Sequence, residues 1–146
     1  MAPTEASALQ IVQEFLDQYG HDRPKAFAAQ IPLRVTGCDP EAMTMDFAVS
    51  IGPELENIWG VAHGGLLATI FDTCMGSTIR GLFALQVVKT VSLQVQYLRP
   101  VPIGAELLLR TRVLSSGRTL KTLTAECWLP GEERRPTNQA TAAFYI

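Results

Sequence analysis

Positive charge, cysteine and histidine are all scarce in this sequence of 146 residues, and each shortage excludes a class of protein. Twelve Lys and Arg residues stand against 14 Asp and Glu, so we expect no basic surface for nucleic acid. The three cysteines, Cys38, Cys74 and Cys127, are odd in number and far apart, unlike a disulfide framework. We therefore expect a reducing, cytoplasmic location, with no metal site and no resident cofactor.

Long apolar runs are missing as well. No run reaches the roughly 18–20 residues that cross a membrane, so we expect no membrane partner. The first residues lack a positive segment followed by an apolar one, which argues against a signal peptide. With no linker, repeat or low-complexity segment, the length predicts a single domain over residues 1–146.

Apolar periodicity then predicts the elements. Spacings of three and four indicate an N-terminal helix within residues 1–20, and a long central helix over residues 64–83. Alternation of apolar and polar residues predicts strands elsewhere. These strands cover residues 31–36, 43–50, 91–97, 106–114, 123–129 and 141–146. We expect an α+β protein whose antiparallel sheet packs against the central helix.

The central helix has two different faces on a wheel of about 100° per residue. One face holds Leu67, Ile70, Phe71, Cys74 and Met75, and the opposite face holds Gly65, Thr69, Asp72 and Gly76. The first is a core stripe. The second either faces water or lines a cleft, and its lack of long charged residues before Arg80 favours the cleft. Partial desolvation there would make a carboxylate a usable base near neutral pH.

The start of this helix offers a second chemical group. Its first backbone N–H groups lack partners within the helix and attract a developing oxyanion, and Gly64 and Gly65 leave them accessible. Eight residues separate Gly64 from Asp72, which is about 12 Å along the axis. One helix cannot apply both groups to one carbonyl. Two antiparallel copies can, so we predict a site shared across a dimer.

The residues that carry this chemistry form a recognisable pattern: Asn57, Gly60, His63-Gly64-Gly65 and Asp72, then TVSLQVQYLRP over residues 90–100, and Ser116-Gly117-Arg118-Thr119. The pattern resembles the hot-dog-fold acyl-CoA thioesterases, in particular their phenylacetate-pathway, PaaI-type branch. The resemblance implies a sheet wrapped around a long central helix. It also implies homodimers joined edge to edge and often paired into homotetramers.

The resemblance also implies residue roles. The Gly64 N–H would polarise the thioester carbonyl, while Asp72 of the facing subunit would act as general base or as nucleophile. Asn57 would position the water or the carbonyl, and His63 would orient the loop. Thr90 stands where relatives often carry Ser or Thr beside the catalytic carboxylate.

Further residues are candidates for holding the substrate. The small residues Gly65, Thr69 and Gly76 would let a ligand approach the helix closely. Arg99 and Arg118 are candidates for the phosphates of coenzyme A, as are Arg112 and Lys121, although each is as readily a solvated strand residue. Apolar candidates for an acyl pocket are Leu66, Leu67, Phe71, Met75, Leu82 and Phe83. Trp128 is expected to point outward, where it would mark a subunit interface.

The leading hypothesis is an acyl-CoA thioesterase acting on a small aromatic or a short- or medium-chain acyl group. A non-catalytic acyl-CoA-binding module and a hot-dog hydratase or dehydratase are the alternatives. A Cys74–His63 nucleophile is disfavoured because Cys74 lies on the core stripe. The sequence leaves open the acyl group, and coenzyme A against acyl carrier protein as the thiol.

Overall fold

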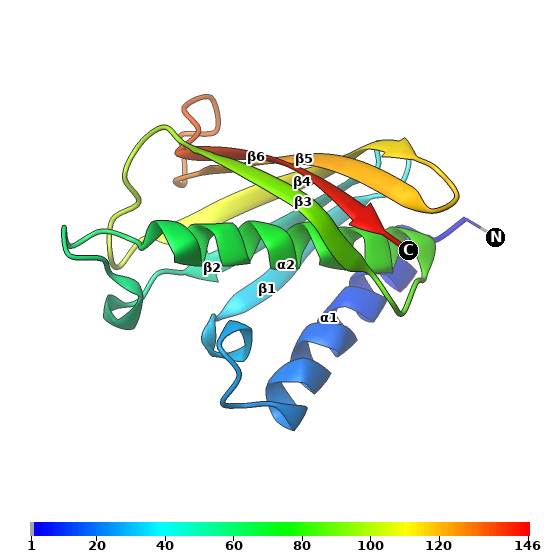
Figure 1. Cartoon of the computed structure of the whole chain (residues 1–146), viewed down its shortest axis with the longest axis horizontal. Coiled ribbons are helices and arrows are strands. Elements are labelled where there is room, and N and C mark those ends of the chain that lie inside the picture. The colour runs from blue at the N-terminus through cyan, green and yellow to red at the C-terminus, as the bar shows by residue number, and fades with distance from the viewer. Residues whose placement is uncertain (1) are drawn as a thin grey trace.

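The computed structural model describes residues 2–146 as two α-helices and six strands (Figure 1). The helices are α1 (Glu5–Asp22) and α2 (Gly64–Phe83), and short 3-10 turns occupy Ala28–Gln30 and Pro53–Leu55. The strands are β1 (Leu33–Asp39), β2 (Thr44–Ser50), β3 (Lys89–Tyr97), β4 (Glu106–Ser116), β5 (Leu120–Trp128) and β6 (Asn138–Tyr145). The bounds of α2 match the prediction, whereas five of the six predicted strands are too short by two or three residues at one end.

The six strands form one antiparallel sheet in the order β1-β2-β4-β5-β6-β3, with β1 and β3 at its edges. Helix α2 runs along one face of this sheet, and α1 lies beside it against β1 (Figure 1). The predicted α+β class is therefore confirmed. No described helix is long and apolar enough to cross a membrane.

Both helices begin at a side-chain cap. Thr4 and Ser7 form a reciprocal capping box at the start of α1, and each satisfies a backbone N–H at the helix N-terminus. His63 caps α2, since its Nδ1 accepts a hydrogen bond from the Gly65 N–H at 3.0 Å. The chain therefore fixes where α2 starts, and with it the position of the Gly64 backbone.

The core lies between α2 and the sheet. The predicted core stripe of α2 is buried there as expected. The apolar α2 residues predicted as candidates for an acyl pocket lie largely in this core, although Leu67 borders one hollow at the start of α2 and Leu66 borders another. Five of the candidates are at most 3% exposed, namely Leu66, Leu67, Phe71, Met75 and Leu82. The sixth, Phe83, is partly buried beneath the ammonium group of Lys121.

A β-bulge at Val91 changes which side chains of β3 face the helix. Leu93 pairs with Ala142 of β6, but Thr90 pairs with Phe144, so the ladder gains one residue between Thr90 and Ser92. The bulge places Thr90 on the same inward side as Leu93, which strict alternation forbids. The apolar alternation of the sequence places Val91 on the same side as Leu93 and Val95, whereas in the structure Val91 is 59% exposed.

Trp128 also departs from the prediction, since it is buried at the end of β5. Its ring is covered by the guanidinium of Arg110, which lies 5.9 Å from the ring centre. Asp46 holds that guanidinium with hydrogen bonds of 2.7 and 3.0 Å and raises the pKa of Arg110. A neighbouring cation, held in place by its carboxylate partner, thus covers an aromatic ring that alternation alone would leave exposed.

Candidate active site

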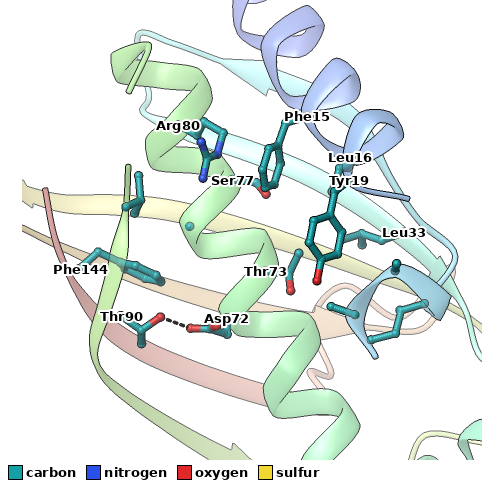
Figure 2. Close-up of a pocket in the computed structure, with 15 residues that line it drawn as sticks. Phe15, Leu16, Tyr19, Leu33, Asp72, Thr73, Ser77, Arg80, Thr90 and Phe144 are labelled. Atoms are coloured by element: carbon teal, nitrogen blue, oxygen red, sulfur yellow. Dashed lines mark hydrogen bonds between the residues drawn. The ribbon is translucent and has the colours of Figure 1, made fainter. Parts of the chain in front are cut away.

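A cavity of about 250 Å³ lies beside α2, bordered by α1, the segment before β1, and the start of β3 (Figure 2). Asp72 and Thr90 stand together on its wall. The Thr90 Oγ1 donates a hydrogen bond of 2.6 Å to the Asp72 Oδ1, as the dashed line in Figure 2 marks. The stripe of α2 that contains Asp72 therefore faces a cleft at this point.

The Val91 bulge explains how a residue of β3 reaches the carboxylate. Without the extra residue, Val91 would oppose Phe144 and the Thr90 side chain would point away from α2. With it, the Thr90 hydroxyl points to Asp72 and fixes one carboxylate oxygen. The second oxygen of Asp72 remains available to a substrate or water.

The start of α2 forms a second cluster. His63 accepts the Gly65 N–H, while the Gly64 N–H makes no hydrogen bond within the described part of the chain. The Tyr97 hydroxyl donates to the Gly64 carbonyl at 2.6 Å, and its ring lies 3.4 Å from where a Cβ at position 64 would stand. Burial raises the pKa of Tyr97, which keeps this hydroxyl protonated as a donor. A free N–H at a helix N-terminus is suited to an oxyanion.

Asn57 belongs to the same end of α2. Its Oδ1 accepts hydrogen bonds from the backbone N–H groups of Trp59 at 2.8 Å and Val61 at 3.3 Å. The loop turns at Gly60, whose φ of +76° suits glycine. Because the carbonyl oxygen of the Asn57 side chain is used by the loop, its NH₂ group is the part that can reach a ligand.

The predicted catalytic residues thus form two clusters in one chain. Asn57 and Gly64 border a hollow of about 280 Å³ at the start of α2, and His63 caps the helix there. Asp72 and Thr90 border the 250 Å³ cavity, two helical turns further along. Within the described chain the two clusters line separate hollows, as the helical spacing between Gly64 and Asp72 predicts.

The predicted substrate-binding residues are also dispersed. Gly76 lines the cavity, and its missing side chain makes room for the ring of Phe144, 3.4 Å from a Cβ placed there. The Thr69 hydroxyl donates to the Gly65 carbonyl at 3.0 Å, one turn back in the helix. Gly65 itself is exposed beside His63, so these two residues lie nearer the helix start than the cavity.

The arginine candidates lie at opposite ends of the sheet. Arg99 follows β3 and borders the hollow at the start of α2, where its guanidinium contacts the carbonyl of Arg135. Arg118 is exposed in the turn between β4 and β5, at the end where Ser116 pairs with Lys121. Lys121, a weaker candidate, is buried, and its ammonium binds the Ser116 hydroxyl at 2.7 Å. It is therefore not available to a phosphate.

The sequence patterns do not identify three side chains that border these hollows: Tyr97, Ser77 and Arg80. Tyr97 stands at the end of the alternating β3 pattern, where the sequence indicates only one more apolar position. Ser77 and Arg80 line the cavity with Asp72, and their spacing from it along α2 was the only signal. Cys74 is fully buried, and burial raises the pKa of its thiol well above the usual value, which makes it a poor nucleophile.

Residues 2–146 bring together no group of three or more His, Cys, Asp or Glu side chains able to hold a metal ion. The two hollows hold one carboxylate, one free helix N-terminus, the guanidinium groups of Arg80 and Arg99, and hydroxyl and amide groups around them. Such a set is suited to acid–base chemistry on a carbonyl compound.

Comparison with known proteins agrees with this architecture. The family model of the thioesterase superfamily matches residues 60–134, about half of the chain, and the chain belongs to that superfamily. A stretch of 62 residues is 32% identical to the bovine (Bos taurus) acyl-coenzyme A thioesterase THEM4. That stretch covers 42% of this chain and 24% of the bovine protein, so the match spans about a quarter of this curated relative.

Solved structures share the whole fold at low identity. Zebra fish thioesterase superfamily member 2 superposes with a TM-score of 0.82 at 19% identity, over 94% of this chain and 97% of that one. The mouse (Mus musculus) protein of the same name superposes with a TM-score of 0.77 at 19% identity, over 95% of this chain and 97% of that one. A variant of the phenylacetic acid degradation protein PaaI from Thermus thermophilus superposes with a TM-score of 0.70 at 20% identity, over 82% of this chain and 96% of that one. The sheet wrapped around α2 is therefore the hot-dog fold that the sequence predicted.

Proposed function

We propose that this protein is an acyl-CoA thioesterase that hydrolyses a small aromatic or a short- or medium-chain acyl-CoA. The observation that carries the proposal is the Asp72 carboxylate, oriented by the Thr90 hydroxyl on the wall of a 250 Å³ cavity. That volume is below the usual range for a drug-sized ligand and suits an acyl group alone. Membership of the thioesterase superfamily and the match to an acyl-coenzyme A thioesterase support the choice of thioester.

The proposed reaction uses the two clusters on opposite sides of one thioester carbonyl. The Gly64 N–H binds the carbonyl oxygen and stabilises the negative charge that develops on it. Asp72 takes a proton from water, and the resulting hydroxide adds to the carbonyl carbon. The carbon–sulfur bond then breaks, and the departing thiolate takes up the proton held by Asp72. In the alternative course Asp72 itself adds to the carbon, the carbon–sulfur bond breaks and the thiolate leaves. Water then hydrolyses the acyl–carboxylate anhydride, which frees the acid and the Asp72 carboxylate and supplies the proton that the thiolate takes up.

Asn57 and His63 act around this centre. The Asn57 NH₂ group orients the water or the carbonyl, and His63 holds the start of α2 so that the Gly64 N–H points at the substrate. Arg99 and Arg118 are proposed to contact the phosphates of coenzyme A, and Gly65, Thr69 and Gly76 to let the thioester lie close to α2. Because Arg99 and Arg118 occupy opposite ends of the sheet, two subunits would supply them to one substrate.

The proposal requires a homodimer, or a tetramer built from dimers. Edge strand β3 carries the exposed apolar side chains of Val91 and Tyr97 and has a free hydrogen-bonding edge. Such an edge pairs readily with a second copy. Antiparallel pairing along β3 would bring the start of α2 in one subunit toward Asp72 of the other.

Thiol release from a panel of aliphatic and aromatic acyl-CoAs tests the proposed function. Asp72→Asn keeps the size of the side chain and the hydrogen bond from Thr90 but removes the base. We expect turnover to fall by about 10²–10⁴-fold, with the fold and oligomer unchanged. Loss of thiol release from every substrate while acyl-CoA still binds would instead indicate a binding module. An enoyl absorbance change without thiol release would indicate a hydratase.

A further inference from the structure

The end of the cavity away from Thr90 is polar, and two of its buried polar atoms lack partners. Ser77 is 2% exposed, and its Oγ makes no hydrogen bond with any described residue. The Arg80 Nε is also buried without a partner. Figure 2 shows both side chains beside Phe15 of α1, at the opposite end of the cavity from the Asp72–Thr90 pair. A buried polar atom without a partner normally destabilises the folded state, so this end is built for a polar group.

The charge of Arg80 is not neutralised by the protein. No carboxylate within residues 2–146 lies within 4.0 Å of its guanidinium, although Arg34, Arg99, Arg110 and Arg135 all have such a neighbour. Its Nη1 donates to the carbonyl of Gln86, and its guanidinium carbon stacks 4.0 Å above the centre of the Phe15 ring. These contacts fix the plane of the guanidinium and leave the buried Nε without an acceptor.

The spacing between the two ends sets the length of a ligand. Ser77 and Arg80 follow Asp72 by five and eight residues, which is about 7.5 and 12 Å along the helix axis. Long helical side chains point back toward the N-terminus, so the Arg80 guanidinium lies nearer to Asp72 than its Cα does. An extended chain advances about 1.2 Å per bond, so a chain of about six carbons joins the two ends.

We infer that this cavity takes an acyl chain whose far end is a carboxylate. The substrate class is then the coenzyme A monothioester of a dicarboxylic acid of about six carbons. The distal carboxylate accepts hydrogen bonds from the Arg80 guanidinium and the Ser77 hydroxyl, while the thioester lies at Asp72. Carboxylates are the groups that the planar guanidinium binds best. This inference rests on the proposed function and names the substrate of the same site.

The cavity wall agrees with such an occupant. Between its two polar ends, the wall is formed by apolar side chains of α1, β1 and β6, such as Leu16, Leu33 and Phe144. These contact the methylene groups of the chain. A neutral acyl group of equal length fills the same space but leaves the Ser77 Oγ and the Arg80 Nε without a partner. We expect the charged chain to bind at least about tenfold more tightly, as one charge-assisted hydrogen bond provides.

Binding to the Asp72→Asn variant tests this inference apart from turnover. Adipoyl-CoA and hexanoyl-CoA have the same chain length and differ in the distal carboxylate. We expect the Kd of adipoyl-CoA to be lower by at least about tenfold. Adding Arg80→Met should abolish that preference, and adding Ser77→Ala should reduce it. Arg134→Met removes an exposed arginine of the loop before β6 and should leave the preference unchanged.

The outcomes separate the two proposals. Equal Kd values for the two ligands, or a preference that survives Arg80→Met, would overturn the dicarboxylate inference and leave the thioesterase intact. Tight, Arg80-dependent binding of adipoyl-CoA without thiol release by the unsubstituted protein would overturn the thioesterase and leave the binding inference. Failure to bind either ligand would overturn the dicarboxylate inference, and thiol release from the acyl-CoA panel would decide the thioesterase separately. The melting temperature of each variant shows that it is folded.

Discussion

At the scale of single residues, the orientation of Asp72 depends on one hydroxyl. The 2.6 Å hydrogen bond from Thr90 holds one carboxylate oxygen and leaves the other to accept a proton from water. A carboxylate that rotates freely spends less time in a reactive geometry, and small misplacements cost large factors in rate. Thr90 therefore acts as a positioning residue for the proposed base.

Thr90→Val removes this hydroxyl while keeping the branched shape of the side chain. We expect kcat to fall by about 10–100-fold, the range for one hydrogen bond to a charged group, with KM little changed. Thr90→Ser restores the hydroxyl and should recover most of kcat. Steady-state kinetics measure both, alongside the melting temperature. A valine variant with the kcat of the original protein would remove Thr90 from the mechanism.

Some residues of the site can be predicted from sequence and others cannot. Asp72 and Gly64 stand out because a lone acid on a stripe of small residues, and a glycine pair before an apolar helix, are local patterns. Ser77 and Arg80 are recognised as candidates only because polar atoms of theirs are buried without hydrogen-bond partners. Their surroundings depend on how α1 and the chain around Gln86 pack against α2, which the sequence does not reveal. The role of Tyr97 likewise depends on its contact with a residue 33 positions away.

At the scale of elements, the cavity exists because α1 packs closely against α2. The contact is made at Gly81, where a Cβ would stand 2.7 Å from Val12 and 3.1 Å from the backbone carbonyl of Ala8. Both α1 residues are fully buried. From this contact, α1 carries Phe15 and Tyr19 over the cavity. A glycine in the last turn of α2 thus sets the position of one cavity wall.

Two glycine-to-alanine changes test that contact with opposite expected signs. Gly81→Ala should lower the free energy of unfolding by about 1–3 kcal/mol, because the added methyl group overpacks the helix contact. Gly20→Ala lies in α1 with nothing within 4 Å of its new Cβ, so it should raise the free energy by about 0.5–1 kcal/mol. Urea unfolding of both variants provides the measurement. Equal effects would show that helix propensity, and not packing, governs position 81.

The elements themselves were largely predictable, but their irregularities were not. Periodicity predicted α2 and the strands because apolar spacing reflects burial directly. It assigned Val91 to the inward set because alternation assumes an unbroken ladder, and the bulge at that residue breaks it. The prediction that Trp128 points outward was wrong for a similar reason. Its ring is covered by Arg110 of β4, which Asp46 of β2 holds in place.

At the scale of the whole molecule, the proposed reaction needs two chains. The free N–H at the start of α2 and the Asp72 carboxylate border separate hollows of one chain. A symmetric dimer joined along β3 would create two equivalent sites, each taking its helix N-terminus from one subunit and its carboxylate from the other. The helical spacing alone predicts this arrangement, whereas the edge strand that would join the subunits emerges only from the sheet order.

Mixed oligomers test this shared site most directly. Asp72→Asn and Asn57→Ala each disable both sites of their own homodimer. In a mixed dimer, a shared site predicts that one of the two sites combines an intact Asp72 with an intact Asn57. Random mixing should therefore restore about a quarter of the original thiol-release activity. If each site is built within one chain, every site carries one substitution and mixing restores nothing, which would contradict the account.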